Sequence, residues 1–159
     1  MQLLIREKEL ELVLRLEPDV LLRGDASRFR QMVVNRLDTA LKYTPLGRTI
    51  ELVVAGTDAT AFLEVTDSGI GIPPEALPYI FDRFYRVDKA RSRETGGSGL
   101  GLSIVKAIAS AYGAEVKVTS SPGRGTSVRV AAPRVPPSPE HPPELRPEAV
   151  VPTEWAAPN

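Results

Sequence analysis

The sequence of 159 residues has no cysteine, one histidine and one tryptophan. Without cysteine, disulfide bonds, zinc–thiolate sites and thiol catalysis are excluded. The single histidine, His141, stands in a proline-dense stretch near the C-terminus, where we interpret it as a solvated side chain. Lysine and arginine together number 20, as do aspartate and glutamate, so no excess of basic side chains suggests nucleic acid as a partner.

Long hydrophobic runs are also absent from the sequence. No stretch approaches the roughly 20 apolar residues that a membrane-spanning helix needs. The first residues carry charge too early for a signal peptide. We therefore expect no membrane segment in this chain and a cytoplasmic location. The sequence does contain 42% hydrophobic residues, which is enough for the core of one folded domain.

Proline content divides the chain into a folded part and a tail. From residue 134 onward prolines recur every few positions and apolar periodicity vanishes. Such a segment cannot bury enough apolar surface to offset its ordering entropy, so we predict a disordered tail at 134–159. We predict a folded domain at 10–133, preceded by a linker remnant at 1–9.

The folded part has the pattern of a mixed α/β domain. Apolar alternation indicates strands at 10–16, 49–55, 61–67, 115–120 and 126–132. A long helix should begin with Asp25 or Ser27 as its N-cap and run to about Tyr43. A second long helix is expected at 100–112, ended by Gly113. Residues 68–94 are predicted to be irregular, with one short helix after residue 74.

The first long helix has an apolar face and a polar face. One face carries Phe29, Val33, Leu37 and Ala40 and should pack on the sheet. The opposite side carries Arg28, Gln31, Asn35, Thr39 and Lys42. Taken alone, these polar residues are most simply interpreted as a solvated surface.

Asp67 is followed by a glycine-rich turn, Ser68-Gly69-Ile70-Gly71. It shares strand parity with Leu63 and Val65, so its carboxylate should point to the buried side of the sheet. A buried carboxylate needs hydrogen-bond donors, and the exocyclic amine of adenine is a suitable donor. The two glycines would let the backbone turn tightly beside a flat ligand. An ordinary turn after a strand explains the same residues about equally well.

A second glycine-rich stretch, residues 96–101, leads directly into the second long helix. A glycine-rich loop at a helix N-terminus presents free N–H groups and the positive end of the helix dipole, which suits phosphate. The stretch is not a Walker A loop, because no Gly-Lys-Ser/Thr follows. A flexible hinge is the alternative interpretation.

Five motifs in this order resemble the ATP-binding catalytic domain of sensor histidine kinases, a branch of the Bergerat-fold ATPases. The resemblance covers residues 10–133. Residues 29–45 (FRQMVVNRLDTALKYTP) are similar to the N box, 67–72 (DSGIGI) to the G1 box, 80–88 (IFDRFYRVD) to the F box, 96–106 (GGSGLGLSIVK) to the G2 box and 123–126 (GRGT) to the last glycine motif. The F box argues against the related anti-sigma type of serine kinase.

The resemblance implies a fold and a reaction. The fold would be a two-layer α/β sandwich whose mixed, largely antiparallel sheet is covered by helices on one face. The reaction would be transfer of the γ-phosphoryl group of Mg-ATP to a histidine on a separate dimerisation domain, in a longer parent chain or on another protein. A response regulator would then be an indirect partner, and the chain would belong to the cytoplasmic part of a sensor.

The same resemblance assigns roles to individual residues. Asp67 would read the adenine amine with a water held by Thr126, and Tyr43 would pack against the base. The remaining implied contacts to the nucleotide are Gly69, Gly71, Ile72, Tyr85, Gly97, Gly99, Leu100 and Gly101. The implied catalytic residues are Asn35, which faces Mg²⁺, and Lys42 and Arg86, which face the phosphates. The segment between Phe81 and Gly97 would form a lid over the nucleotide.

Thr39 departs from the family pattern, in which a second N-box asparagine ligates Mg²⁺ at this position. Threonine is shorter and offers a hydroxyl oxygen, so it would act as a metal ligand through a water or not at all. A second hypothesis is therefore a catalytically weakened module that binds nucleotide or docks a partner.

Overall fold

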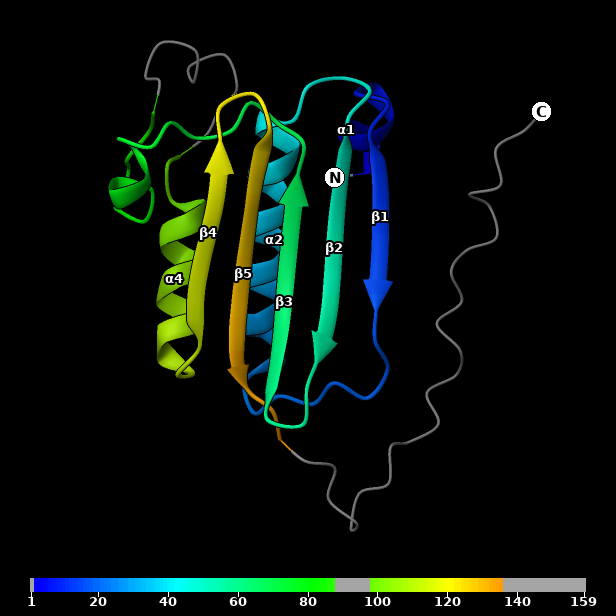
Figure 1. Ribbon diagram of the computed structural model, residues 1–159, viewed down its shortest axis with the longest axis vertical. Helices are drawn as coiled ribbons and strands as arrows, with labels where there is room; N and C mark the ends of the chain where they lie inside the picture. Colours follow the sequence, from blue (N-terminus) through cyan, green and yellow to red (C-terminus); the bar gives the residue numbers. More distant parts are fainter. Residues whose placement is uncertain (1, 88–97, 136–159) are drawn as a thin grey trace, which may run out of the picture.

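The computed structural model describes residues 2–87 and 98–135, which form a five-stranded sheet with helices on one face (Figure 1). The strand order is β1-β2-β3-β5-β4; β1 and β2 are parallel, and all other neighbours are antiparallel. The predicted α/β sandwich with a mixed sheet is therefore confirmed. The elements are α1 (Gln2–Glu7), β1 (Glu11–Leu16), α2 (Ala26–Tyr43), β2 (Thr49–Gly56), β3 (Thr60–Asp67), η1 (Leu77–Tyr79), α4 (Gly101–Ala111), β4 (Glu115–Ser121) and β5 (Gly125–Pro133).

The predicted strands and long helices are all present, with ends that differ by about a residue. Asp25 is the N-cap of α2, and its carboxylate accepts a hydrogen bond from the backbone N–H of Arg28 at 3.0 Å. The short helix expected after residue 74 is the 3-10 helix η1. Much of the predicted lid, 88–97, and the tail from 136 lie outside the described residues. In the part of the chain that is described, no helix is long and apolar enough to cross a membrane.

Residues 2–7 form the helix α1, which the sequence analysis did not predict. Ile5 of this helix belongs to a buried apolar cluster that includes Leu41 of α2. Lys8, just after α1, donates from Nζ to the carbonyl oxygens of Leu41 at 2.6 Å and Thr44 at 3.0 Å. A cation in this position is stabilised by the negative, C-terminal end of the α2 dipole. This N-terminal segment therefore packs on the domain.

The buried side of α2 is wider than predicted. Val33 is only half-buried, whereas Met32 and Arg36, which the predicted face left out, are buried together with Ala40. The reason is that α2 packs against both the sheet and α4, and Met32 joins a cluster with Val105 of α4. A helix covered on two sides buries more of its circumference than a helix lying on a sheet alone.

The inward side of β3 and β5 is buried at Val65, Asp67, Thr126, Val128 and Val130. In the antiparallel register Leu63 pairs with Val130, Val65 with Val128, and Asp67 with Thr126. Alternate residues of a strand point to the same face, so Asp67 continues the apolar side of β3. The fold therefore places a carboxylate at the end of the core, beneath the helix layer.

Candidate functional site

A cavity of about 760 Å³ lies where β3 ends and α4 begins. Its lining brings together most of the residues predicted for the site, namely Asn35, Thr39, Lys42, Tyr43, Asp67, Gly71, Ile72, Tyr85, Arg86, Gly99, Gly101 and Thr126. Gly69 and Leu100 are adjacent in the sequence to residues that line the cavity, but they are not part of the lining themselves. Gly97 lies outside the described residues. Small-molecule sites typically have volumes of about 300–1,000 Å³.

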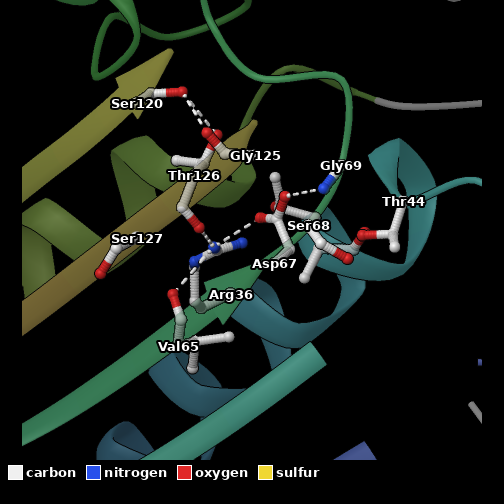
Figure 2. Close-up of polar contacts among 12 residues, drawn as sticks. Arg36, Thr44, Val65, Asp67, Ser68, Gly69, Ser120, Gly125, Thr126 and Ser127 are labelled. Atoms are coloured by element: carbon white, nitrogen blue, oxygen red, sulfur yellow. Dashed lines mark hydrogen bonds and ion pairs between the residues drawn. The ribbon is translucent and has the colours of Figure 1, made fainter. Parts of the chain in front are cut away.

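Asp67 lies at the floor of this cavity with only 4% of its surface exposed. Its Oδ1 accepts a hydrogen bond from the backbone N–H of Gly69 at 3.0 Å, and its Oδ2 accepts one from Nη2 of Arg36 at 2.8 Å (Figure 2). The burial that strand parity predicted is confirmed. The donors that satisfy the carboxylate here belong to the protein itself. Each oxygen keeps a further lone pair with which to accept a bond from a ligand.

Arg36 is a buried residue of the site that the sequence did not predict. It comes from the middle of α2, is 3% exposed and also lines the cavity. Its Nη2 donates to the carbonyl oxygens of Val65 at 3.0 Å and Thr126 at 3.1 Å as well as to Asp67. Burial lowers the pKa of the Arg36 guanidinium, and the charge of Asp67 and its hydrogen bond act in the opposite direction. The only sequence signal was a charged residue four positions from Met32 and Ala40 on an apolar face.

The loop after β3 is fixed against the β4–β5 turn by a small hydroxyl network. The Oγ atoms of Ser120 and Thr126 lie 2.8 Å apart, and Ser120 Oγ also accepts a bond from the N–H of Ile72 at 2.8 Å. Gly71 has φ +72°, and a Cβ there would lie 2.0 Å from the carbonyl oxygen of Ser121. Only glycine permits both this backbone conformation and this close approach. The network thus holds the wall of the cavity next to Asp67.

The side chains predicted to face metal and phosphate line the other part of the cavity. Asn35 donates from Nδ2 to the carbonyl oxygen of Gln31 at 2.8 Å, and Thr39 donates from Oγ1 to the carbonyl oxygen of Asn35 at 2.8 Å. Lys42 is exposed. Among the described residues no group of three or more histidine, cysteine, aspartate or glutamate side chains could hold a metal ion. The oxygen atoms that line the cavity here include Asn35 Oδ1 and the carboxylate of Asp38, and oxygen is the ligand that Mg²⁺ prefers.

The glycine-rich stretch meets the segment that resembles the F box through backbone contacts. The N–H of Phe84 donates to the carbonyl oxygen of Gly99 at 3.0 Å, and a Cβ on Gly99 would lie 2.9 Å from the Phe84 backbone. Phe84 has φ +65° and is 69% exposed, so it is not a core residue. Tyr85 packs against Tyr79 with ring centroids 5.6 Å apart. These contacts bring Tyr85 and Arg86 to the rim of the cavity, beside the start of α4.

Comparison with known proteins identifies the family. Residues 24–136 match the family described as "Histidine kinase-, DNA gyrase B-, and HSP90-like ATPase". The chain belongs to this ATPase family. It is 48% identical over 109 residues to the sensor histidine kinase YkoH of Bacillus subtilis, a match that covers 69% of this chain and 24% of YkoH.

Solved structures agree with this family assignment. The mycobacterial sensor histidine kinase MprB superposes with a TM-score of 0.71 at 30% identity, covering 86% of this chain and 90% of that chain. Full-length ShkA in complex with AMPPNP gives a TM-score of 0.73 at 28% identity, covering 87% of this chain and 28% of ShkA. The chain spans about a quarter of the length of the curated relatives it matches, between 21% and 27%.

Proposed function

We propose that this chain binds Mg-ATP in the cavity and donates the γ-phosphoryl group to a histidine on a separate dimerisation domain. The reaction would take place in the cytoplasm, as part of two-component signal transduction. The observation that carries the proposal is the position of Asp67, a buried carboxylate at the floor of a cavity whose other part reaches the N-terminus of α4. A buried acceptor suits the adenine amine, and a helix N-terminus suits phosphate. ShkA, one of the similar structures, holds the ATP analogue AMPPNP.

The chemistry of phosphoryl transfer asks mainly for positioning and charge neutralisation. The bond from the γ-phosphorus to its bridging oxygen breaks, and a bond to an imidazole nitrogen of the partner forms. Four cationic residues of the described part of the chain line the cavity, and of these Lys42 and Arg86 are the ones we propose to face the triphosphate, because Lys8 bonds to the end of α2 and Arg36 pairs with Asp67. Asn35 Oδ1 is a hard oxygen of the kind Mg²⁺ prefers, and Mg²⁺ would add positive charge next to the phosphates.

A second candidate function is a module that binds nucleotide without efficient transfer. The observation that favours it is the hydrogen bond from Thr39 Oγ1 to the carbonyl oxygen of Asn35, its own helix neighbour, at 2.8 Å. The hydroxyl donates its hydrogen in this bond and keeps its lone pairs, but the bond holds the side chain against the helix, so Oγ1 is not free to turn toward a cation. Under this hypothesis the domain would signal nucleotide occupancy to a partner.

One experiment separates the two functions. The chain is first titrated with Mg-ATP by calorimetry and then mixed with γ-labelled ATP and a dimerisation domain that carries the acceptor histidine. We expect binding, followed by an acid-labile and alkali-stable label on the partner. Binding without label supports the second candidate, and absence of binding contradicts both. Lys117→Gln is a matched control, because Lys117 is exposed on β4, does not line the cavity and forms an ion pair with Glu115 at 3.5 Å.

A further inference from the structure

Arg36 is a buried cation at the floor of the cavity to which the proposed function gives no role. Its guanidinium lies between the ends of β3 and β5, directly beside the carboxylate of Asp67 (Figure 2). Most lysine and arginine side chains remain in water, and full burial requires pairing. Asp67 supplies the opposite charge at 2.8 Å. The pair therefore presents an acceptor and a donor side by side at one place in the site.

The hydrogen bonds of Arg36 are unevenly distributed over its nitrogens. Within residues 2–87 and 98–135, all three acceptors of the guanidinium, on Val65, Asp67 and Thr126, are bonded by Nη2. Nε is buried without a partner. Arginine has five N–H donors, and Nη2 carries only two of them. Donor capacity therefore remains on the side chain that lines the cavity, and a buried donor without an acceptor is unfavourable.

The combination of acceptor and donor has a chemical complement in adenine. The exocyclic amine of adenine donates, and the ring nitrogen on either side of it, N1 or N7, accepts. A carboxylate alone reads only the amine. Resting on the proposed function, we propose that Arg36 is a specificity-determining residue that donates a hydrogen bond to a ring nitrogen of the adenine whose amine is accepted by Asp67. The base would thus be read by a charged pair from two elements, α2 and β3.

Two ATP analogues test the contact directly, because each replaces one ring nitrogen by C–H. We measure the dissociation constants of ATP, 1-deaza-ATP and 7-deaza-ATP for the native chain by calorimetry. Loss of a hydrogen bond to a charged donor should weaken one of the two analogues by about 10- to 100-fold relative to ATP. The other analogue should bind about as ATP does. Equal affinity for all three nucleotides would overturn the inference while leaving the proposed function intact, whereas failure of ATP to bind would overturn both.

A bridging water on the ring nitrogen would also make an analogue bind weakly, and Arg36→Lys distinguishes this case. Lysine retains the positive charge beside Asp67 but loses the planar fork and its additional donors. We expect the sensitive analogue and ATP to bind Arg36→Lys within about threefold of each other. An undiminished difference would contradict the inference. Arg30→Lys, on the exposed side of the same helix, is the matched control and should keep the native difference.

A measurement on the native chain alone keeps the inference testable if Arg36→Lys fails to fold. The side-chain N–H signals of Arg36 in an isotope-labelled sample should shift on addition of ATP and exchange more slowly with solvent. The sensitive analogue should leave these signals close to their ligand-free positions. GTP provides a further check, since its edge presents a carbonyl oxygen where adenine presents the amine. Tighter binding of GTP than of ATP would contradict the assignment to adenine.

Discussion

The two parts of the cavity are built in different ways. At the end lined by Arg36, Asp67 and Thr126, where the base is proposed to bind (the base end), Arg36 of α2 bonds to the carboxylate of Asp67 and to the backbone carbonyl of Thr126, and Arg36 and Asp67 are almost completely buried. At the end lined by Asn35, Thr39 and Lys42, where the phosphates are proposed to bind (the phosphate end), the side chains of Asn35 and Thr39 bond, among the described residues, only to carbonyl groups of their own helix, and Lys42 is exposed. The base end is therefore part of the folded core, whereas the phosphate end would be completed by its ligand. Substitutions at the base end should affect stability and binding together, and those at the phosphate end chiefly binding.

The largest effect is expected for Asp67→Asn. This change removes the charge that compensates Arg36 in the core, and breaking one side of a buried ion pair costs roughly 3–5 kcal/mol. We expect the free energy of unfolding in urea to fall by about that amount. Binding of ATP should weaken sharply as well, because one of the two acceptor oxygens becomes an NH2 group, which cannot accept a hydrogen bond from the adenine amine.

A double variant checks the cause of that loss. Arg36→Met combined with Asp67→Asn removes both charges, and apolar replacement of buried pairs is often close to neutral. Most of the stability should return, while ATP binding should not. If the single variant Asp67→Asn were as stable as the native chain, the base end would not belong to the core and the comparison would be wrong.

The next effect concerns the wall of the base end, where Gly71→Ala should destabilise the domain. A left-handed conformation costs a non-glycine residue about 1–2 kcal/mol, and crowding adds about 1–3 kcal/mol. The Cβ would lie 2.0 Å from the carbonyl oxygen of Ser121. Gly123→Ala is the matched control, since Gly123 has φ +75° but no neighbour within 4 Å of its Cβ. Thermal unfolding should show a clearly larger decrease in melting temperature for Gly71→Ala than for Gly123→Ala. Equal decreases would show that the backbone around Ser121 shifts to accommodate the added Cβ.

Much of the base end could be predicted from the sequence, because its key signal is local. Strand parity placed Asp67 on the buried side of β3, and paired glycines marked the turn that follows. Arg36 could not be predicted, because a charged residue on a helix is normally exposed and its partners are 29 to 90 residues away in the sequence. Only the fold brings Arg36 to these partners, because it places the ends of β3 and β5 beside α2.

The helix α1 in the N-terminal segment could not be predicted, for the same reason. This six-residue helix is too short to be stable by itself, and its packing depends on the distant Leu41. The contact of Lys8 with the end of α2 spans 33 or more residues of sequence. Periodicity within the segment carries no information on such contacts. The boundaries of strands and long helices, which depend on local pattern and caps, were predicted to within about a residue.

A moderate effect is expected where α4 approaches the phosphate end. A Cβ on Gly101 would lie 2.7 Å from Thr39 Oγ1, so Gly101→Ala should cost about 1–3 kcal/mol through crowding, partly offset by up to about 1 kcal/mol of helix propensity. Thr39→Ala should relieve the contact, and the double variant should be more stable in urea than Gly101→Ala alone. Additive effects of the two substitutions would mean that this close approach is not what Gly101 provides.

The smallest effect, and the most informative one for function, is expected for Thr39→Asn. The native hydroxyl bonds back to Asn35, and such back-bonding contributes little to helix stability, so the free energy of unfolding should change by less than about 1 kcal/mol. An asparagine would bring an amide oxygen to the lining of the cavity next to Asn35, and hard oxygens are the ligands that Mg²⁺ prefers. We expect Mg-ATP to bind severalfold and up to about tenfold more tightly, which corresponds to about 1.4 kcal/mol. Binding of ATP in the presence of a chelator should stay the same, because Asp67 and Arg36 at the base end are unaffected.

Titration of the native chain and of Thr39→Asn with ATP, with and without Mg²⁺, tests this prediction. An identical Mg²⁺ dependence in the two proteins would show that position 39 only packs against Gly101 and takes no part in holding the metal, and the phosphate end would then be organised by Asn35 and Lys42 alone.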